Sequence, residues 1–163
     1  MNFLRNAVLF KKIMIQKKID KKFGFSGKGI KVAVIFSQFN DEIGAKLLDK
    51  TLNELKKQHV KNIKIFTVPG ALEIPVTAKK IIDKGGFDVI IALGVVIKGT
   101  TSHYEHVSRE SIHGVQKLSI KYGFPIISGI LTVLNKKQAL ERIDNGISYA
   151  RSAIHIYHTL KTI

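Results

Sequence analysis

Residues 88–97 read DVIIALGVVI, and this run decides the fold class. It is apolar at nearly every position and is interrupted only by Gly94, so both of its faces can be buried. A strand that is apolar on both faces is typical of a parallel sheet covered by helices on both sides. The run is far shorter than the roughly 20 residues that a membrane-spanning helix needs. Residues 88–97 are therefore expected to form a central strand of an α/β domain.

The same kind of pattern repeats along the chain. Other runs rich in β-branched residues alternate with amphipathic stretches whose apolar residues recur at helical spacing. The expected strands are 30–37, 63–68, 88–97 and 125–134. The expected helices are 41–58, 71–84, 105–122, 136–143 and one from about 147 onward, in which Ile147, Ala150, Ile154, Tyr157 and Leu160 share a face.

This alternation of strands and helices predicts one domain of the α/β class. Right-handed crossovers would place the helices on both faces, giving a three-layer α/β/α sandwich around a central four-stranded parallel sheet, with flavodoxin-like topology. We expect this domain to occupy residues 30–163. Residues 1–29 are expected to be an N-terminal extension or arm, and they lack the small-residue cleavage site of a signal peptide.

Composition limits the function classes. The 163-residue chain has no cysteine, which excludes disulfides and thiolate metal sites and suits a cytoplasmic protein. Its histidines do not show the spacing of a metal site, so no metal is expected. The net charge is +15, but the lysines are scattered and have no aromatic residues interleaved with them. Neither nucleic acid nor a membrane is therefore expected as a partner.

Ligands of an open parallel sheet bind beyond the carboxyl ends of its strands. The segments there are 37–40, 68–73, 97–103 and the turn after Leu134. The third segment combines Gly99 with hydroxyl side chains just before a helix, where free N–H groups favour an anion. His103 at its edge could transfer protons near neutral pH. The alternative is that these hydroxyls only cap a helix and that His103 is an ordinary surface residue.

Two other residues of these segments also allow two interpretations. Phe39 is either a platform for a planar ring or a core aromatic that closes the sheet edge, and its position alone favours the core. Glu73 lies in the first turn of an expected helix, where the helix dipole explains it without a functional role. Asn40 or Asp41 is expected to cap the helix at 41–58.

Four stretches together resemble the lumazine synthase family. They are QFNDEI at 38–43, VPGALEIPVTAKK at 68–80, ALGVVIKGTTSHYEHV at 92–107 and PIISGILTVLNKKQALER at 125–142. The stretches occur in the order and spacing of the family, over about residues 30–142. The pairing of VPG-x-x-E-IP with G-x-VI-[RK]-G-x-T-x-H is far more specific than one short motif.

The resemblance implies an enzyme of riboflavin biosynthesis. The family condenses 5-amino-6-(D-ribitylamino)uracil with 3,4-dihydroxy-2-butanone 4-phosphate to 6,7-dimethyl-8-ribityllumazine, releasing phosphate and water. No metal or organic cofactor takes part. The resemblance also implies a cytoplasmic homo-oligomer, either a pentamer or a shell of about 60 subunits.

The resemblance also assigns site residues. Phe39 matches the aromatic that lies against the pyrimidine ring, and His103 matches the proton-transfer histidine. Arg142 matches an arginine that a neighbouring subunit contributes to bind phosphate. The other matched positions are Asn40, Ala71, Leu72, Glu73, Val96, Ile97 and Ser128 for the ribitylaminouracil, and Gly99, Thr100 and Thr101 for the butanone phosphate.

This sequence departs from the family pattern at several of these places. Lys98 replaces an arginine, and Ser128 replaces an aromatic that covers the substrate from the next subunit. A Gly/Lys-rich stretch usually follows the arginine matched by Arg142, and here it is about five residues shorter and lacks a phosphate-side lysine. The acidic residue that often orients the histidine aligns with Ser148. These differences bear on phosphate binding and on shell formation.

Three other functions stay open on the sequence. The first is a non-catalytic shell or assembly protein of the same fold, which alanine at His103 and Arg142 would leave unaffected. The second is a basic nucleic-acid-binding domain, which would show steeply salt-dependent binding without turnover. The third is the riboflavin synthase that shares this fold in some lineages, which would make riboflavin from lumazine alone.

Overall fold

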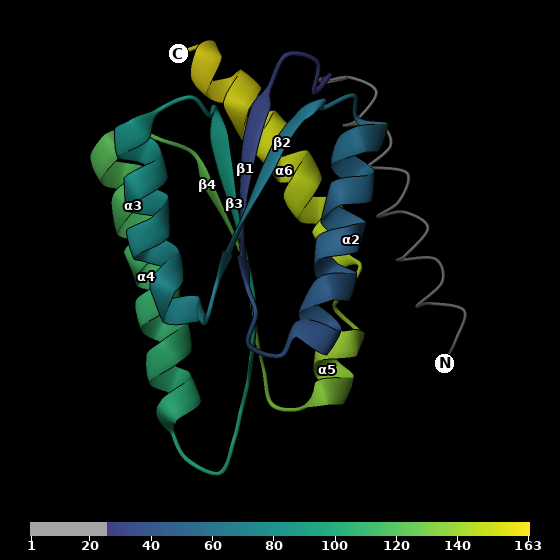
Figure 1. Ribbon diagram of the computed structural model, residues 1–163, viewed down its shortest axis with the longest axis vertical. Coiled ribbons are helices and arrows are strands. Elements are labelled where there is room, and N and C mark those ends of the chain that lie inside the picture. Colours follow the sequence, from purple (N-terminus) through teal and green to yellow (C-terminus); the bar gives the residue numbers. More distant parts are fainter. Residues whose placement is uncertain (1–25) are drawn as a thin grey trace, which may run out of the picture.

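The computed structural model describes residues 26–163 (Figure 1). The predicted arm at 1–29 lies, as far as residue 25, outside the described residues. Four parallel strands form one sheet in the order β2-β1-β3-β4. The strands are β1 (Lys31–Ser37), β2 (Asn62–Val68), β3 (Val89–Ile97) and β4 (Ile126–Val133). The predicted α/β class and all-parallel sheet are therefore confirmed.

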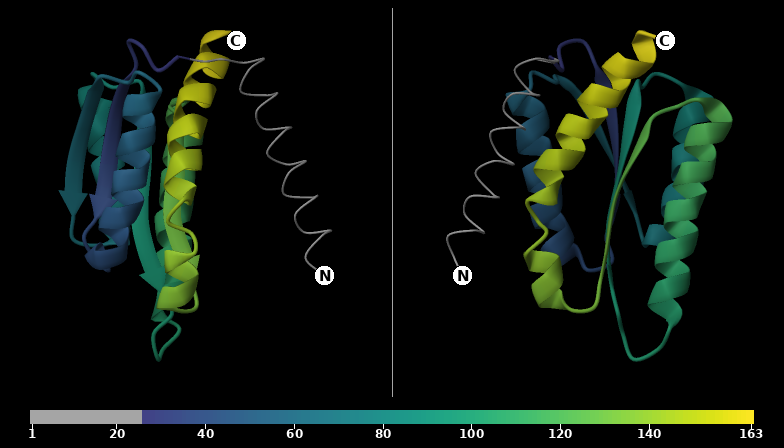
Figure 2. Two further views of the ribbon diagram at one scale, coloured as in Figure 1. Left: turned by 90° about the vertical axis from the view of Figure 1, so that its right-hand side faces the viewer. Right: turned by 180° about the vertical axis from the view of Figure 1, so that it is seen from behind.

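Helices cover both faces of this sheet, as Figures 1 and 2 show. One face carries α2 (Asp41–Lys57), the short α5 (Lys136–Leu140) and α6 (Asn145–Lys161). The other carries the 3-10 turn η1 (Ala71–Glu73), α3 (Ile74–Lys84) and α4 (His103–Tyr122). Within residues 26–163 no helix is long and apolar enough to cross a bilayer.

The core is divided by the sheet into two clusters. In β3 successive side chains point to opposite faces, and nearly all of them are buried, as expected for a strand covered on both sides. The α2/α6 cluster includes Val34, Leu47, Ile91 and Ile154, and the α3/α4 cluster includes Ile35, Ile74, Ile90 and Val115. The central strands β1 and β3 are thereby held rigidly, which fixes the loops at their ends.

The helices differ in detail from the sequence-based expectation. The helix expected at 71–84 is divided into η1 and α3, with Pro75 in the first turn of α3, where its missing N–H costs nothing. The helix expected from 105 already begins at His103. On the shared face of the last helix Ala150 and Ile154 are buried, whereas Leu160 is exposed because the end of α6 passes beyond the strands (Figure 1).

Candidate active site

The carboxyl ends of the strands gather at one edge of the sheet, at the lower end of Figure 1. There β1 stops before β3 does. The β1–β3 pairing ends at Phe36 opposite Leu93, whereas β3 continues beside β4 as far as Ile97 opposite Val133. The last residues of β3 therefore lack a neighbouring strand on the β1 side. This step in the sheet edge leaves room for a ligand and for the loop after β1.

Phe39 lies on that loop and points outward. The backbone N–H groups of Gln38 and Phe39 donate to the carbonyls of Val68 and Pro69 at 2.9 and 3.1 Å, which continues the β1–β2 pairing past both strand ends. The main chain is thus fixed while the Phe39 side chain is 70% exposed. The interpretation of Phe39 as a core aromatic is wrong, because the loop continues the strand direction past the sheet edge and leaves no layer to cover the ring.

Asn40 fills part of the step. It has left-handed backbone angles (φ 61°, ψ 39°), which asparagine tolerates better than most residues. Its side-chain amide donates to the carbonyl of Val95 at 2.8 Å, a group with no partner from β1. Asn40 occupies the N-cap position of α2 but does not cap it with its side chain, contrary to expectation.

The end of β3 offers one free backbone edge. Backbone groups of a strand alternate between its two neighbours, so the backbone of Ile97 faces the same side as that of Val95, beyond the end of β1. The backbone of Val96 faces β4, where Val96 pairs with Thr132. Ile97 is therefore the better placed of the two for a backbone contact to a ligand.

Glu73 stabilises the turn after β2. Its carboxylate accepts a hydrogen bond from the backbone N–H of Gly70 at 2.9 Å. A Cβ at Gly70 would lie only 3.0 Å from the same Glu73 oxygen, so the turn is tightly closed. Ala71 is buried under it, and Leu72 is exposed. The three residues form η1 on the α4 side of the sheet.

The loop after β3 begins at a fixed point. The backbone N–H of Lys98 donates to Val133 at 2.9 Å, and its ammonium lies 5.7 Å from the centre of the Tyr104 ring. Gly99, Thr100 and Thr101 are exposed. Ser102 does not cap α4 with its side chain, and the nearest capping contact is a long one, 3.4 Å from the His103 N–H to the Thr101 hydroxyl. His103 is exposed in the first turn of α4.

Arg142 lies between α5 and α6, on the opposite face of the sheet from α4 (Figure 2). Its Nη1 donates to the carbonyl of Gln138 at 2.9 Å, and the side chain is 46% exposed. The shortened stretch after it is a continuous turn, since Asn145 and Ile147 donate to the carbonyls of Arg142 and Asp144 at 3.0 and 3.1 Å.

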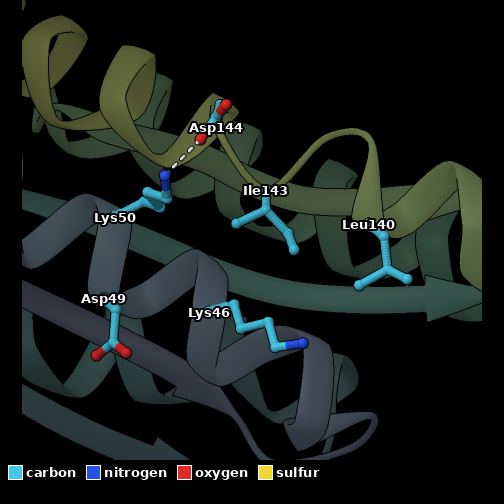
Figure 3. Close-up of a pocket in the computed structure, with 6 residues that line it drawn as sticks. All are labelled: Lys46, Asp49, Lys50, Leu140, Ile143 and Asp144. Carbon is cyan, nitrogen blue, oxygen red and sulfur yellow. Dashed lines mark ion pairs between the residues drawn. The ribbon is translucent and has the colours of Figure 1, made fainter.

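A hollow of about 370 Å³ lies on that same face, between α2 and the α5–α6 turn (Figure 3). An ion pair of 2.8 Å between Lys50 and Asp144 crosses it. The lining residues are Lys46, Asp49, Lys50, Leu140, Ile143 and Asp144, none of which was predicted to bind substrate. The hollow flanks the Arg142 turn rather than the segment that begins at His103.

A single protomer thus brings together only part of the predicted site. Phe39, Asn40, η1, the end of β3 and the loop 98–103 meet at one sheet edge. Ser128 does not join them, because it pairs with Ala92 near the middle of the sheet. Arg142 is separated from His103 by the sheet itself. Within residues 26–163, no group of histidine and acidic side chains is arranged to hold a metal ion.

Two residues that sequence reasoning missed support Arg142. Asn135 accepts a hydrogen bond from the backbone N–H of Gln138, and the Gln138 side chain accepts one from Leu134, both at 2.9 Å. The pattern of Asn followed three residues later by Gln is a helix-start signal and could have identified the pair.

Comparison with known proteins agrees with the fold and with these segments. The family model described as 6,7-dimethyl-8-ribityllumazine synthase matches residues 29–161. The match covers most of the chain and includes every residue discussed above as part of the site.

Proposed function

This chain belongs to the 6,7-dimethyl-8-ribityllumazine synthase family, a family of transferase enzymes of riboflavin biosynthesis, and we propose that it catalyses the family's condensation itself. In that reaction the 5-amino group of 5-amino-6-(D-ribitylamino)uracil attacks the ketone of 3,4-dihydroxy-2-butanone 4-phosphate. Water leaves to give a Schiff base, and loss of the proton next to the imine carbon expels phosphate and leaves an enol. The enol tautomerises to a ketone, and the ribityl-bearing nitrogen attacks this carbonyl with loss of a second water to close the ring.

The exposed ring of Phe39 is the observation that carries this proposal. An aromatic side chain that is 70% exposed on a loop tied to β2 costs free energy unless something planar or apolar covers it. It lies on the loop that passes the step in the sheet edge, next to Asn40, whose side chain bonds the Val95 carbonyl near the end of β3. A pyrimidine ring stacked on Phe39 could form hydrogen bonds to the free backbone of Ile97, while its 5-amino group faces the loop 98–103.

The phosphate substrate would occupy the loop side of the same cleft. The N–H groups of the first turn of α4 suit the phosphate because they carry the positive end of the helix dipole, and the exposed backbone of Gly99 and Thr100 lies just before them. His103 is placed to move protons during Schiff-base formation and phosphate loss. Holding both reactants in one orientation would supply much of the acceleration.

Arg142 would complete the site from a neighbouring subunit. Within its own protomer Arg142 lies on the opposite face of the sheet from α4, which supports a role across an interface. Its guanidinium presents paired donors that match a phosphate. Exposed apolar side chains that follow strand ends, such as Leu72 and Leu134, favour burial against another copy. We therefore propose a homopentamer in which each site is shared by two subunits.

Further assembly into a shell is a separate question. The α5–α6 turn lacks the longer stretch that influences shell closure in the family, so a free pentamer is the expected particle. Particle mass in solution separates a monomer, a pentamer and a shell. A cytoplasmic location stays a prediction.

The activity is tested by mixing both substrates with the protein and following the absorbance of the lumazine product. The expected result is turnover well above the spontaneous condensation, and its loss in His103→Ala. Turnover no faster than the spontaneous reaction would contradict the proposal and favour a non-catalytic assembly protein of this fold. Riboflavin formed from lumazine alone would instead identify the related synthase.

A further inference from the structure

The turn that presents Arg142 is held by a small hydrogen-bond network. We infer that Asn135 and Gln138 are positioning residues for the phosphate-bearing substrate, acting through the Arg142 guanidinium. This inference rests on the proposed function, because it gives Arg142 the phosphate group as its ligand.

The network begins at the start of α5. The Asn135 side-chain oxygen accepts from the Gln138 backbone N–H, and the Gln138 side-chain oxygen accepts from the Leu134 backbone N–H, both at 2.9 Å. An isolated helix of five residues is unstable in water, so α5 depends on such caps and on the buried Ala139. These two bonds therefore fix where α5 begins and how it is oriented against β4.

The backbone of Gln138 then holds Arg142 directly. The Arg142 backbone N–H donates to Ala139 at 3.0 Å, which leaves the carbonyl of Gln138 without its usual helical partner. The guanidinium donates a hydrogen bond to this carbonyl through Nη1 at 2.9 Å. Nη1 is thus used for orientation and also lies 4.0 Å from the Glu141 carboxylate, and Nε and Nη2 remain to bind an anion as a fork.

The other end of the turn is anchored as well. Asp144 pairs with Lys50 on α2 at 2.8 Å, and a Cβ at Gly146 would lie 2.7 Å from the Leu47 carbonyl (Figure 3). The start of α6 is therefore packed tightly on α2 and can shift little. With that end fixed, the direction of Arg142 is determined at the Asn135–Gln138 end.

This arrangement separates a positioning role from a purely structural one. Leu134 and Asn135 are exposed, so water can replace the bonds that Gln138→Ala and Asn135→Ala remove, and the fold is retained. The carbonyl of Gln138 also stays in both variants. What is lost is the constraint on its position, and with it the orientation of the guanidinium.

The test measures steady-state kinetics of the full-length oligomer with each substrate varied in turn. For Gln138→Ala and Asn135→Ala we expect the KM for the butanone phosphate to rise about three- to tenfold, as for the loss of one hydrogen bond. The KM for the ribitylaminouracil and kcat should stay within about twofold. Inhibition by inorganic phosphate should weaken in parallel. Asn135→Ser keeps a neutral acceptor oxygen at the start of α5 and should stay close to the wild-type KM.

Two controls make the outcome decisive. Gln116→Ala removes an exposed glutamine from the middle of α4 and should change nothing. Arg142→Ala tests the proposed function itself. If Arg142→Ala raises the KM for the phosphate substrate while Gln138→Ala behaves like Gln116→Ala, the inference is wrong and the proposed function stands. If Arg142→Ala has no effect, the proposed role of Arg142 in phosphate binding is wrong, and the inference is wrong with it.

A structural role would give a different pattern. It would raise both KM values together, or lower the particle mass of Gln138→Ala and Asn135→Ala. Either result, measured in the same preparations, overturns the inference. Selective loss of phosphate affinity at unchanged particle mass supports it.

Discussion

The side-chain amide of Asn40 donates a hydrogen bond of 2.8 Å to the backbone carbonyl of Val95. The contact joins the loop after β1 to β3 at the point where β1 has already ended. It satisfies a carbonyl that would otherwise lack a strand partner, and it fixes the residue next to Phe39. The position of the exposed ring therefore depends on a contact between its own loop and a different strand.

Replacement of Asn40 separates this contact from its backbone conformation. Asn40→Ala loses the hydrogen bond and also places a less tolerant residue at φ 61°, so two costs of about 1 kcal/mol each are expected. Asn40→Gly also loses the hydrogen bond but avoids the second cost, because glycine adopts that backbone conformation freely. Urea unfolding at fixed protein concentration should rank the wild type above Asn40→Gly and both above Asn40→Ala. Equal stability of all three would show that the contact contributes nothing.

Phe39 is predicted to act on one substrate only. Stacking of a base on an aromatic side chain contributes about 1–3 kcal/mol, so Phe39→Ala should raise the KM for the ribitylaminouracil about five- to 150-fold. Phe39→Tyr keeps the ring and should stay close to the wild type. Since the ring is exposed in the protomer, the melting temperature of the protomer fold should not fall with Phe39→Ala. An equal rise of the KM for the phosphate substrate would argue against stacking.

Much of the fold follows from burial patterns that are local in the sequence. The run at β3 is apolar on both faces, so its place inside a covered parallel sheet could be predicted. The exposure of Phe39 could not, because hydrophobicity indicates that a ring needs a partner but not whether its own core or another molecule provides it. Position alone favoured the core, and the structure places the ring outside.

Other parts of the site depend on contacts between distant segments. The hydrogen bond from Asn40 to Val95 depends on where β1 ends relative to β3. No local sequence pattern in residues 37–41 predicts that position. The separation of Arg142 from His103 depends on the face of the sheet to which α5 returns. In contrast, the link between Asn135 and Gln138 is local, at three residues' spacing, and is a recognisable helix-start pattern.

A site shared between two subunits predicts that two inactive variants can restore activity when they are combined in one oligomer. A site within a single chain cannot do this. His103→Ala should be nearly inactive as a pure oligomer, and Arg142→Ala should be nearly inactive at substrate concentrations well below its raised KM. When the two are unfolded together in equal amounts and refolded, about one quarter of the ring interfaces should pair a native His103 with a native Arg142. The expected result is recovery of about a quarter of the wild-type activity. Mixing after folding, without exchange of subunits, is the matched control and should recover none.

If refolded mixtures stay as inactive as their components, both residues serve the same protomer or Arg142 serves no site. Recovery without mixed particles, which tagged subunits would detect, would point to residual activity of one variant instead. The experiment therefore tests the interface independently of any distance within one chain.

The pair formed by Glu54 and Arg151 connects α2 to α6 and makes stability depend on pH. Glu54 is only 5% exposed, and its carboxylate accepts from the Arg151 Nε at 2.8 Å and from Gln58 at 2.8 Å. Burial by itself raises the pKa of Glu54, but the hydrogen bonds from Arg151 and Gln58, together with the charges of Arg151 and Lys57, lower it below its ordinary value of 4.5 overall.

A folded-state pKa below the unfolded one means that the charged carboxylate stabilises the fold. This contribution is fully present above about pH 4.5, the unfolded value, and is lost as the pH falls through the lower folded-state pKa. Glu54→Gln should therefore reduce stability at pH 7 by about 1.5–3 kcal/mol, the range for a charged hydrogen bond. The difference between variant and wild type should shrink as the pH falls below 4.5.

Glu42→Gln is the matched control for this prediction. Glu42 lies in the first turn of the same helix and pairs with Lys136 at 3.5 Å, but both side chains are exposed, so solvent screens the pair. At one protein concentration, the urea midpoint of Glu54→Gln should be lower than that of the wild type at pH 7 and closer to it at pH 4. The midpoint of Glu42→Gln should hardly differ from the wild type at either pH. If the loss in Glu54→Gln were the same at both pH values, the missing interaction would be packing rather than charge, and Glu54 would not contribute to acid unfolding.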